Sequence, residues 1–221
     1  MKQTILKYSS LLALLSAPFF STQTFAAECA TGTAPLAGCT IDVSDITYTL
    51  TGDIEPAEDV IGIEFKTDAD RNIVTQTGNI TTTGVRAYGL YLNTSDSNTT
   101  TLTGNITTTG DDARGLWLFD SNSNTTTLTG NISTAGAGAH GMVLSTSDSN
   151  TTLTGNITTT GYSAYGLILY DSESITTTLT GNISTAGDDA YGLWLFDSES
   201  NTTTLTGNIT TTGDGAYGMR L

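Results

Sequence analysis

The stretch GNITTTGDDARGLWLFDSNSNTTTLT, residues 104–129, is one copy of a unit that runs through most of this sequence. Its opening motif recurs, with small changes, at Gly78, Gly104, Gly130, Gly155, Gly181 and Gly207. These glycines are spaced by 26, 26, 25, 26 and 26 residues, and a more divergent copy begins at Gly52. Repeats of this length are typical of solenoids, in which each unit stacks on its neighbours. The sequence therefore predicts about seven stacked units.

Each unit favours β-strands, because it is rich in Thr, Ile, Leu and aromatic residues and has no helical periodicity. A first strand, TLTGNITT at residues 101–108, places Leu102 and Ile106 on one side. A second strand, GLWLF, alternates its two leucines with Trp117 and Phe119. Between the strands lie runs of Asp, Ser, Asn and Gly, which form turns. Two strands per unit are expected.

Comparison between units shows which side of the second strand faces inward. One pair of positions accepts only Leu or Met, and its members are Leu90/Leu92, Leu116/Leu118, Met142/Leu144, Leu167/Leu169, Leu193/Leu195 and Met219/Leu221. The position between them varies and holds Tyr91, Trp117, Val143, Ile168, Trp194 and Arg220. A position that tolerates Arg lies outside, so the paired aliphatics form the core.

One unit cannot bury enough aliphatic side chains to fold alone, so neighbouring units must stack and share one core. We therefore predict an all-β fold, a parallel β-helix of about seven coils over residues 48–221. Within it, Gly104 and its equivalents mark a narrow or bent place. The asparagine that follows each of these glycines should form a ladder, each amide bonding to the next.

The amino-terminal region has the layout of a secretory signal. Lys2 and Lys7 precede an apolar run over residues 11–20, and small residues end at Ala26. We predict a signal peptide at residues 1–26, with Ala27 as the alternative cleavage site, and a cap at residues 27–47. In an oxidising compartment, Cys29 and Cys39 can close a small loop as a disulfide within that cap.

Composition excludes several classes of function. The chain has 22 acidic and 7 basic residues, and this charge repels nucleic acid and anionic lipid. No segment after the signal is long and apolar enough to insert into a bilayer. His140 is the only histidine, so we expect neither a metal site nor any other cofactor.

The repeated coils resemble the passenger region of bacterial autotransporters, a family exported by type V secretion. The motifs that carry the resemblance are GNI followed by Thr or Ser and, further on, AYGL, within residues 48–221. The resemblance implies a Gram-negative protein that crosses the periplasm and is secreted or displayed at the outer membrane. It also implies roles in adhesion and aggregation. The family's carboxy-terminal β-barrel is absent from the sequence, which favours a fragment of a longer passenger.

Two sets of outward residues are candidate binding surfaces. Exposed aromatic residues bind sugars or proteins by stacking and apolar contact, or pack only on one another; here they are Tyr91, Trp117, Phe119, Tyr170, Trp194 and Phe196. A second set of Thr-x-Thr pairs resembles the ice-binding face of β-solenoid antifreeze proteins; it comprises Thr101/Thr103, Thr127/Thr129, Thr152/Thr154, Thr178/Thr180 and Thr204/Thr206. Threonine is also an ordinary strand residue.

A further position, just before the second strand, holds Tyr88, Arg114, His140, Tyr165, Tyr191 and Tyr217. Because it accepts Arg and His, we expect an exterior corner there and no catalytic role for His140. The carboxylates fall in turns and the basic residues are scattered, so no enzyme is predicted.

The leading functional prediction is a β-helical adhesin or interaction stalk. Its expected partners are glycans or proteins of host or bacterial surfaces, or further copies of the chain. An ice-binding protein and a passive spacer are the alternatives.

Overall fold

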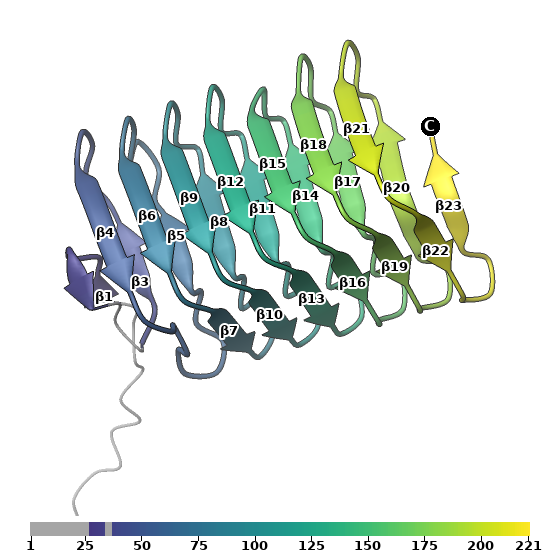
Figure 1. Ribbon diagram of the computed structural model, residues 1–221, viewed down its shortest axis with the longest axis horizontal. Coiled ribbons are helices and arrows are strands. Elements are labelled where there is room, and N and C mark those ends of the chain that lie inside the picture. Colours follow the sequence, from purple (N-terminus) through teal and green to yellow (C-terminus); the bar gives the residue numbers. More distant parts are fainter. Residues whose placement is uncertain (1–26, 34–36) are drawn as a thin grey trace, which may run out of the picture.

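The chain folds into a parallel β-helix, as the repeat predicts (Figure 1). The structure, a computed structural model, describes residues 27–33 and 37–221. The predicted signal peptide, residues 1–26, lies outside the described residues, and so does part of the predicted cap, residues 34–36. Among the described residues, no helix has the length and apolar character needed to cross a membrane.

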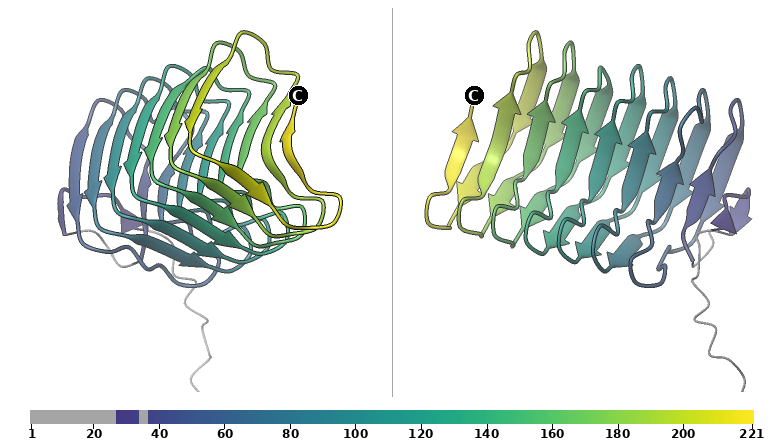
Figure 2. Two further views of the ribbon diagram at one scale, coloured as in Figure 1. Left: turned by 45° about the vertical axis from the view of Figure 1, so that its right-hand side comes forward. Right: turned by 180° about the vertical axis from the view of Figure 1, so that it is seen from behind.

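Three sheets form the sides of the coil, and Figure 2 shows them wrapped around a common interior. The nine-stranded sheet contains β1 (Ala27–Glu28), β3 (Cys39–Ile41), β5 (Ile63–Phe65), β8 (Leu90–Asn93), β11 (Leu116–Phe119), β14 (Met142–Ser145), β17 (Leu167–Tyr170), β20 (Tyr191–Phe196) and β23 (Tyr217–Arg220). The eight-stranded sheet contains β2 (Gly32–Thr33), β4 (Thr47–Thr51), β6 (Ile73–Thr77), β9 (Thr99–Thr103), β12 (Thr125–Thr129), β15 (Asn150–Thr154), β18 (Thr176–Thr180) and β21 (Thr202–Thr206). The six-stranded sheet contains β7 (Ile80–Thr83), β10 (Ile106–Thr109), β13 (Ile132–Ala135), β16 (Ile157–Thr159), β19 (Ile183–Thr185) and β22 (Ile209–Thr211).

The prediction of two strands per unit was wrong, because a complete coil has three. The segment predicted as one strand, residues 101–108, divides at Gly104 and Asn105 into β9 and β10, which belong to different sheets. Gly104 has φ 145°, which lets the chain turn a corner there. Side chains still alternate across the corner, so Leu102 and Ile106 both point inward as predicted.

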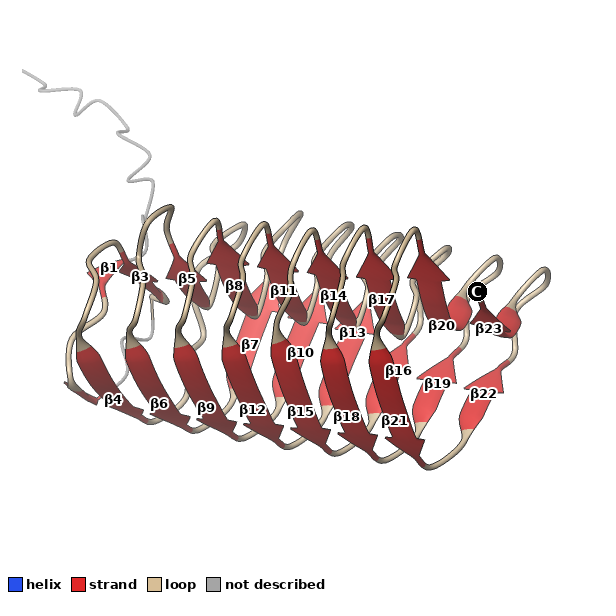
Figure 3. Cartoon of the chain, turned by 90° about the horizontal axis from the view of Figure 1, so that it is seen from above, coloured by secondary structure: helices blue, strands red, loops and turns tan. Residues whose placement is uncertain are grey.

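Equivalent residues of successive coils lie directly above one another. In the eight-stranded sheet, Leu102 pairs with Leu128, and Leu128 pairs with Leu153. The shorter interval, 25 residues instead of 26, is accommodated without breaking this register. Figure 3 shows the strands of each sheet following one another along the rod. Every strand pair is parallel, so the fold is one continuous stack.

Columns of buried aliphatic side chains form the core. Leu90, Leu116, Met142 and Leu167 are each 0 or 1% exposed, and the other sheets contribute columns through Leu102 and Ile106. At the last coil Met219 pairs with Leu193 in the inward column, but Met219 is 52% and Leu221 84% exposed, because a coil covers them on one side only.

Glycine at the corner is also required by the close stacking of coils. A Cβ added at Gly130 would lie 2.0 Å from the carbonyl oxygen of Gly104, the equivalent glycine one coil earlier. The same contact recurs at Gly155, 1.9 Å from the carbonyl oxygen of Gly130. The column therefore excludes any side chain.

The predicted disulfide between Cys29 and Cys39 is present, and both residues are buried. Cys39 lies in β3, and the backbone N–H of Cys29 donates to the carbonyl of Thr40. The short strands β1 and β2 thus extend two of the sheets past β3 and β4.

Candidate functional site

The outward side of the nine-stranded sheet carries most of the large aromatic side chains. Alternation along β11 sends Leu116 and Leu118 into the core and Trp117 and Phe119 outward, as predicted. Trp117 is half-buried, whereas Phe119 is 38% exposed. Both rings therefore point outward from β11, and Phe119 is the more accessible of the two.

The column that begins at Tyr88 is exterior, but it lies against the neighbouring aromatic column and is not an isolated corner. Tyr88 is only 8% exposed, and its ring centroid is 5.0 Å from that of Trp117. The guanidinium of Arg114 lies over the Trp117 ring, with its central carbon 3.9 Å from the ring centroid. The sequence contained a signal for this contact, because the two columns are always three residues apart.

The predicted aromatic stripe is divided into two clusters. The N-terminal aromatic cluster comprises Tyr88, Tyr91, Arg114, Trp117 and Phe119, and Tyr91 stacks on Trp117 with centroids 4.6 Å apart. The C-terminal aromatic cluster comprises Tyr165, Tyr170, Tyr191, Trp194 and Phe196.

In the C-terminal aromatic cluster the rings run along the rod. Tyr165 stacks on Tyr191 at 4.8 Å, and Tyr170 stacks on Phe196 at 5.3 Å. Trp194 meets Phe196 at 5.6 Å. A shallow hollow of about 390 Å³ lies next to this cluster, between Tyr191, Tyr217, Met219 and Arg220.

The two clusters are separated because the coil between them supplies small or aliphatic residues at these positions. Val143 pairs with Trp117, and Ser145 pairs with Phe119. Val143 and Ile168 are both 5% exposed although they occupy outward positions. The six residues of the predicted stripe therefore present two separate aromatic surfaces.

His140 lies between the clusters in the same column as Arg114 and Tyr165. Its ring stacks on Tyr165 at 4.9 Å, and its Nδ1 accepts a hydrogen bond from the backbone N–H of Tyr165 at 3.0 Å. Burial, with a smaller contribution from the charge of Arg114, lowers the pKa of His140 to about 3. A neutral imidazole used as an acceptor in a packed stack serves the structure of the column.

Burial also perturbs the neighbouring groups. It raises the pKa of Tyr91 to about 12, and it lowers the pKa of the Arg114 guanidinium, whose Nε and Nη1 have no hydrogen-bond partner. The face of Trp117 is therefore the principal contact of that cation.

The Thr-x-Thr pairs lie on the outward side of the eight-stranded sheet. Thr101 pairs with Thr127, and Thr127 with Thr152, so the hydroxyls of successive coils are in register. A third outward threonine precedes each pair at most levels, as Thr99 and Thr125 do, and sequence reasoning missed this column. The backbone of Thr154 continues the strand, and its side chain lies outside the described part.

The predicted asparagine ladder is present at the corner between the eight-stranded and six-stranded sheets. The backbone N–H of Asn105 donates to Oδ1 of Asn79 at 2.9 Å, and that of Asn131 donates to Oδ1 of Asn105 at 2.9 Å. The side-chain amides add longer contacts of 3.3 and 3.2 Å. Asp53 begins the ladder by accepting from Asn79.

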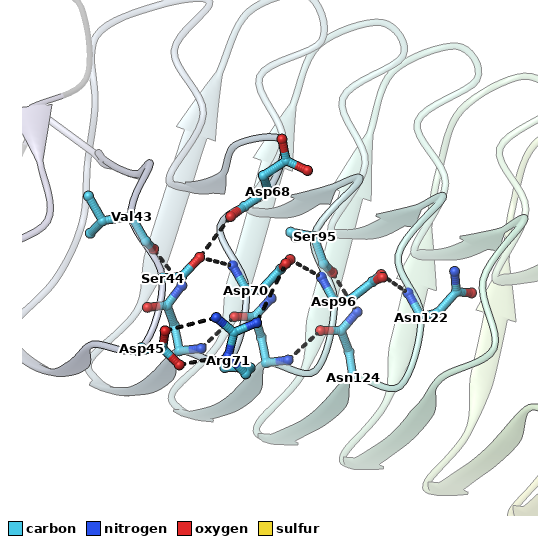
Figure 4. A network of polar contacts seen from close by, with 12 residues as sticks. Val43, Ser44, Asp45, Asp68, Asp70, Arg71, Ser95, Asp96, Asn122 and Asn124 are labelled. Atoms are coloured by element: carbon cyan, nitrogen blue, oxygen red, sulfur yellow. Dashed lines mark hydrogen bonds and ion pairs between the residues drawn. The ribbon is translucent and has the colours of Figure 1, made fainter.

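A second set of ladders stabilises the corner before the eight-stranded sheet (Figure 4). There the N–H of Asp96 donates to Oδ1 of Asp70 at 2.8 Å, and the N–H of Asn122 donates to Oδ1 of Asp96 at 2.6 Å. A hydrogen bond from Arg71 lowers the pKa of the Asp45 carboxyl. The carboxylates of Asp70 and Asp96 accept backbone N–H groups, which explains their place in the turns.

Few of the described residues are suitable ligands for a transition metal. Cys29 and Cys39 are joined in a disulfide, Met142 is 1% exposed, and His140 already accepts a hydrogen bond. In residues 27–33 and 37–221, no group of three His, Cys, Asp or Glu side chains is placed to hold a metal ion.

Comparison with known protein families finds a match over most of the chain. No curated protein and no solved structure matches the chain. A family model described as "Periplasmic copper-binding protein (NosD)" matches residues 36–214. The donors that copper prefers are His, Cys and Met, and the described residues do not gather them, so they do not fit a copper site. The match extends from before β4 into the last coil, and the chain therefore belongs to the NosD family.

Proposed function

We propose that this protein is an exported β-helical interaction protein, whose two aromatic clusters bind glycans or proteins of bacterial or host surfaces. The observation that carries the proposal is the exposure of ordered rings on one side of the rod. Phe119, Tyr170 and Phe196 are 38, 42 and 39% exposed, although each lies against another aromatic ring.

Pre-positioned rings are suited to weak binding of sugars and apolar protein surfaces. Their stacked neighbours fix their orientation, so little side-chain freedom is lost on binding. Trp117 and Trp194 are three coils apart, or about 14 Å at ~4.8 Å per coil. Two such surfaces on one rigid rod can engage one extended partner together and increase the overall affinity.

Export is supported by three features. The sequence begins with a predicted signal peptide, the disulfide suits an oxidising compartment, and the family description names the periplasm. Display at the outer membrane, as an adhesin of autotransporter type, is the finer form of this proposal. Its support is the GNITTT and AYGL motifs of the coils.

We expect no catalytic activity. The imidazole of His140 is held in the ring stack, and the carboxylates of Asp70 and Asp96 accept backbone N–H groups. General acid or base chemistry needs a titratable group free to reach a substrate.

The test compares binding of the exported protein with that of a Trp194→Ala/Phe196→Ala variant. Both proteins are applied to a glycan array and to bacterial and epithelial cells, and circular dichroism checks the fold. We expect binding to weaken at least tenfold in the variant. Tyr162→Ala is the matched control, since Tyr162 is 60% exposed and takes part in neither cluster.

Two results would contradict the proposal. Equal binding by the double variant and the wild-type protein would remove the C-terminal aromatic cluster from the mechanism. Failure of the folded wild-type protein to bind any glycan or cell would favour the alternative of a passive spacer.

A further inference from the structure

We propose that the outward side of the eight-stranded sheet is an ice-binding surface. It is a different face from the one that carries the aromatic clusters, so it adds a second function and does not depend on the first. We call it the threonine face and define it as the outward positions of β4, β6, β9, β12, β15, β18 and β21.

The composition of the threonine face is nearly uniform. Each of its seven strands supplies three outward positions, and threonine occupies 19 of these 21 positions. The exceptions are Ile73 and Asn150. Where the side chains are described, they are exposed or half-buried, as shown by Thr99, Thr101 and Thr103 in β9.

The threonine face contains no charged residue, although the chain has 22 Asp and Glu residues. Charge begins at the adjoining corner, where Asp70, Asp96 and Asp148 precede the strands. A sheet face kept soluble by ordinary means would include charged side chains. Exclusion of charge suits a ligand that has no charge and cannot solvate ions, as is true of ice.

The nine-stranded sheet does not share this regularity, and the six-stranded sheet has an outward threonine column that is interrupted by Ser133 and Ser184. Along the equivalent outward column of the nine-stranded sheet the residues are Glu64, Tyr91, Trp117, Val143, Ile168, Trp194 and Arg220. Both sheets have the same strand geometry and the same requirement for β propensity. Propensity alone therefore does not explain why one face keeps threonine and the other varies.

The geometry makes the threonine face a two-dimensional lattice. Successive coils are about 4.8 Å apart, and alternate residues along a strand are about 6.7 Å apart. Strand pairing fixes the register, since Thr99, Thr101 and Thr103 lie opposite Thr125, Thr127 and Thr129. These repeats are close to the spacings of water oxygens on the faces of an ice crystal.

Threonine supplies the two groups that an ice surface can use. Its hydroxyl can occupy a water position in the lattice, and its methyl group orders adjacent water. The β-branched side chain is stiff, so the array loses little rotamer entropy when it meets a rigid surface. The threonine face has three outward positions on each of seven strands, so many weak contacts with ice can contribute to the binding free energy together.

The experiment measures thermal hysteresis and ice-crystal shape with the exported full chain at millimolar concentration. We expect faceted crystals and measurable hysteresis for the wild-type protein. Thr127→Lys, in the middle column of the face, should lose more than half of the hysteresis. Thr107→Lys is the matched control, because Thr107 is outward and half-buried like Thr127 but lies in the six-stranded sheet.

Several outcomes would overturn the inference. One is the absence of hysteresis in the folded wild-type protein, and another is equal hysteresis in the Thr127→Lys variant. Sedimentation equilibrium tests whether a second copy of the chain, instead of ice, binds to the threonine face. A wild-type dimer that Thr127→Lys converts to a monomer, without an effect on ice, would make the threonine face a self-association surface. Glycan and cell binding are tested with the Trp194→Ala/Phe196→Ala variant, and ice binding is tested with Thr127→Lys. Because these substitutions lie on different faces, either function can fail alone.

Discussion

At the scale of single residues, His140 shows how one substitution in a repeated column changes the chemistry of that column. Tyrosine occupies the equivalent position at Tyr88, Tyr165 and Tyr191, and each of these rings packs against another aromatic ring. The imidazole of His140 is instead held neutral by burial, with its Nδ1 accepting from the backbone of the next coil. This column should therefore make folding sensitive to acid.

We predict that His140→Tyr reduces the loss of stability in acid. The pKa of His140 is about 3 in the folded chain against an ordinary value of 6.5, so below pH 6.5 the unfolded chain alone gains the proton. Stability is unaffected above pH 6.5 and falls as the pH drops toward 3. Between pH 7.5 and 4.5, urea unfolding should show the wild-type protein losing about 1–3 kcal/mol more than the variant.

The comparison uses the change with pH, because the variant also loses the Nδ1 hydrogen bond at every pH. Tyr162→Phe serves as the control and should keep the pH dependence of the wild-type protein. An identical acid loss in wild-type and His140→Tyr proteins would show that His140 is protonated in the folded chain.

Residue comparison between units predicted inward and outward positions well, but it did not predict the clusters. The inward positions of Leu116 and Leu118 were predicted correctly because equivalent positions in all units have the same environment, so the residues found there can be compared. The contact of Arg114 with Trp117 depends on how two columns lean on each other, and no single column contains that information. The division of the stripe follows from Val143 and Ser145, which pair with Trp117 and Phe119 and interrupt the column of rings.

At the scale of elements, inward threonines separate into two kinds. Thr108 in β10 donates from Oγ1 to the carbonyl of Ala113 at 2.7 Å, and Thr134 makes the same bond to Ala139. Thr126 in β12 is equally buried, but its Oγ1 has no partner. The two strands therefore use the same residue type for different purposes.

We predict opposite effects for Thr108→Val and Thr126→Val. The first leaves the buried carbonyl of Ala113 unpaired and should lower the free energy of unfolding by about 1–2 kcal/mol. The second removes an unpaired hydroxyl and should be neutral or stabilising by up to about 1 kcal/mol. Urea unfolding at pH 7.5 measures both. Each variant is the other's control, and equal destabilisation would refute a role for the hydroxyl bond.

The number of strands was the element-level feature that the sequence did not reveal. Alternation continues unbroken across Gly104, since Leu102 and Ile106 both face inward, so periodicity gave no sign of the corner. The glycine and the following asparagine did mark it, through φ 145° and the amide ladder. A corner in a solenoid preserves the inside and outside of the chain while it changes the sheet.

At the scale of the whole molecule, the fold was predictable because stability arises between neighbouring coils. The repeat length defines the coil, and parallel pairing in register follows from stacking equal coils. Function is less predictable at this scale, since the faces of the rod depend on which variants stand next to one another. Membership of the NosD family does not assign copper to these faces, because the described donors do not fit copper.

The same nearest-neighbour organisation predicts that one whole coil can be removed. Deletion of residues 104–129 joins Thr103 to Gly130, so that β9 takes the place of β12 opposite β15. The columns of Leu102 and of the asparagine ladder then continue, through Leu153 on one side and Asn131 on the other. The shortened chain should fold, with an unchanged β-sheet circular dichroism signal per residue.

The deletion should lower stability without changing the type of transition. A solenoid of one fewer coil has one fewer interface, and the urea m-value should fall by roughly one-seventh, in proportion to the surface exposed on unfolding. Deletion of residues 104–116 is the control, because half a coil brings inward positions of one sheet against corners of another. If the half-coil deletion unfolds as cooperatively as the full-coil deletion, register between coils does not determine the fold. If neither folds, the coils are less independent than their repeated contacts indicate.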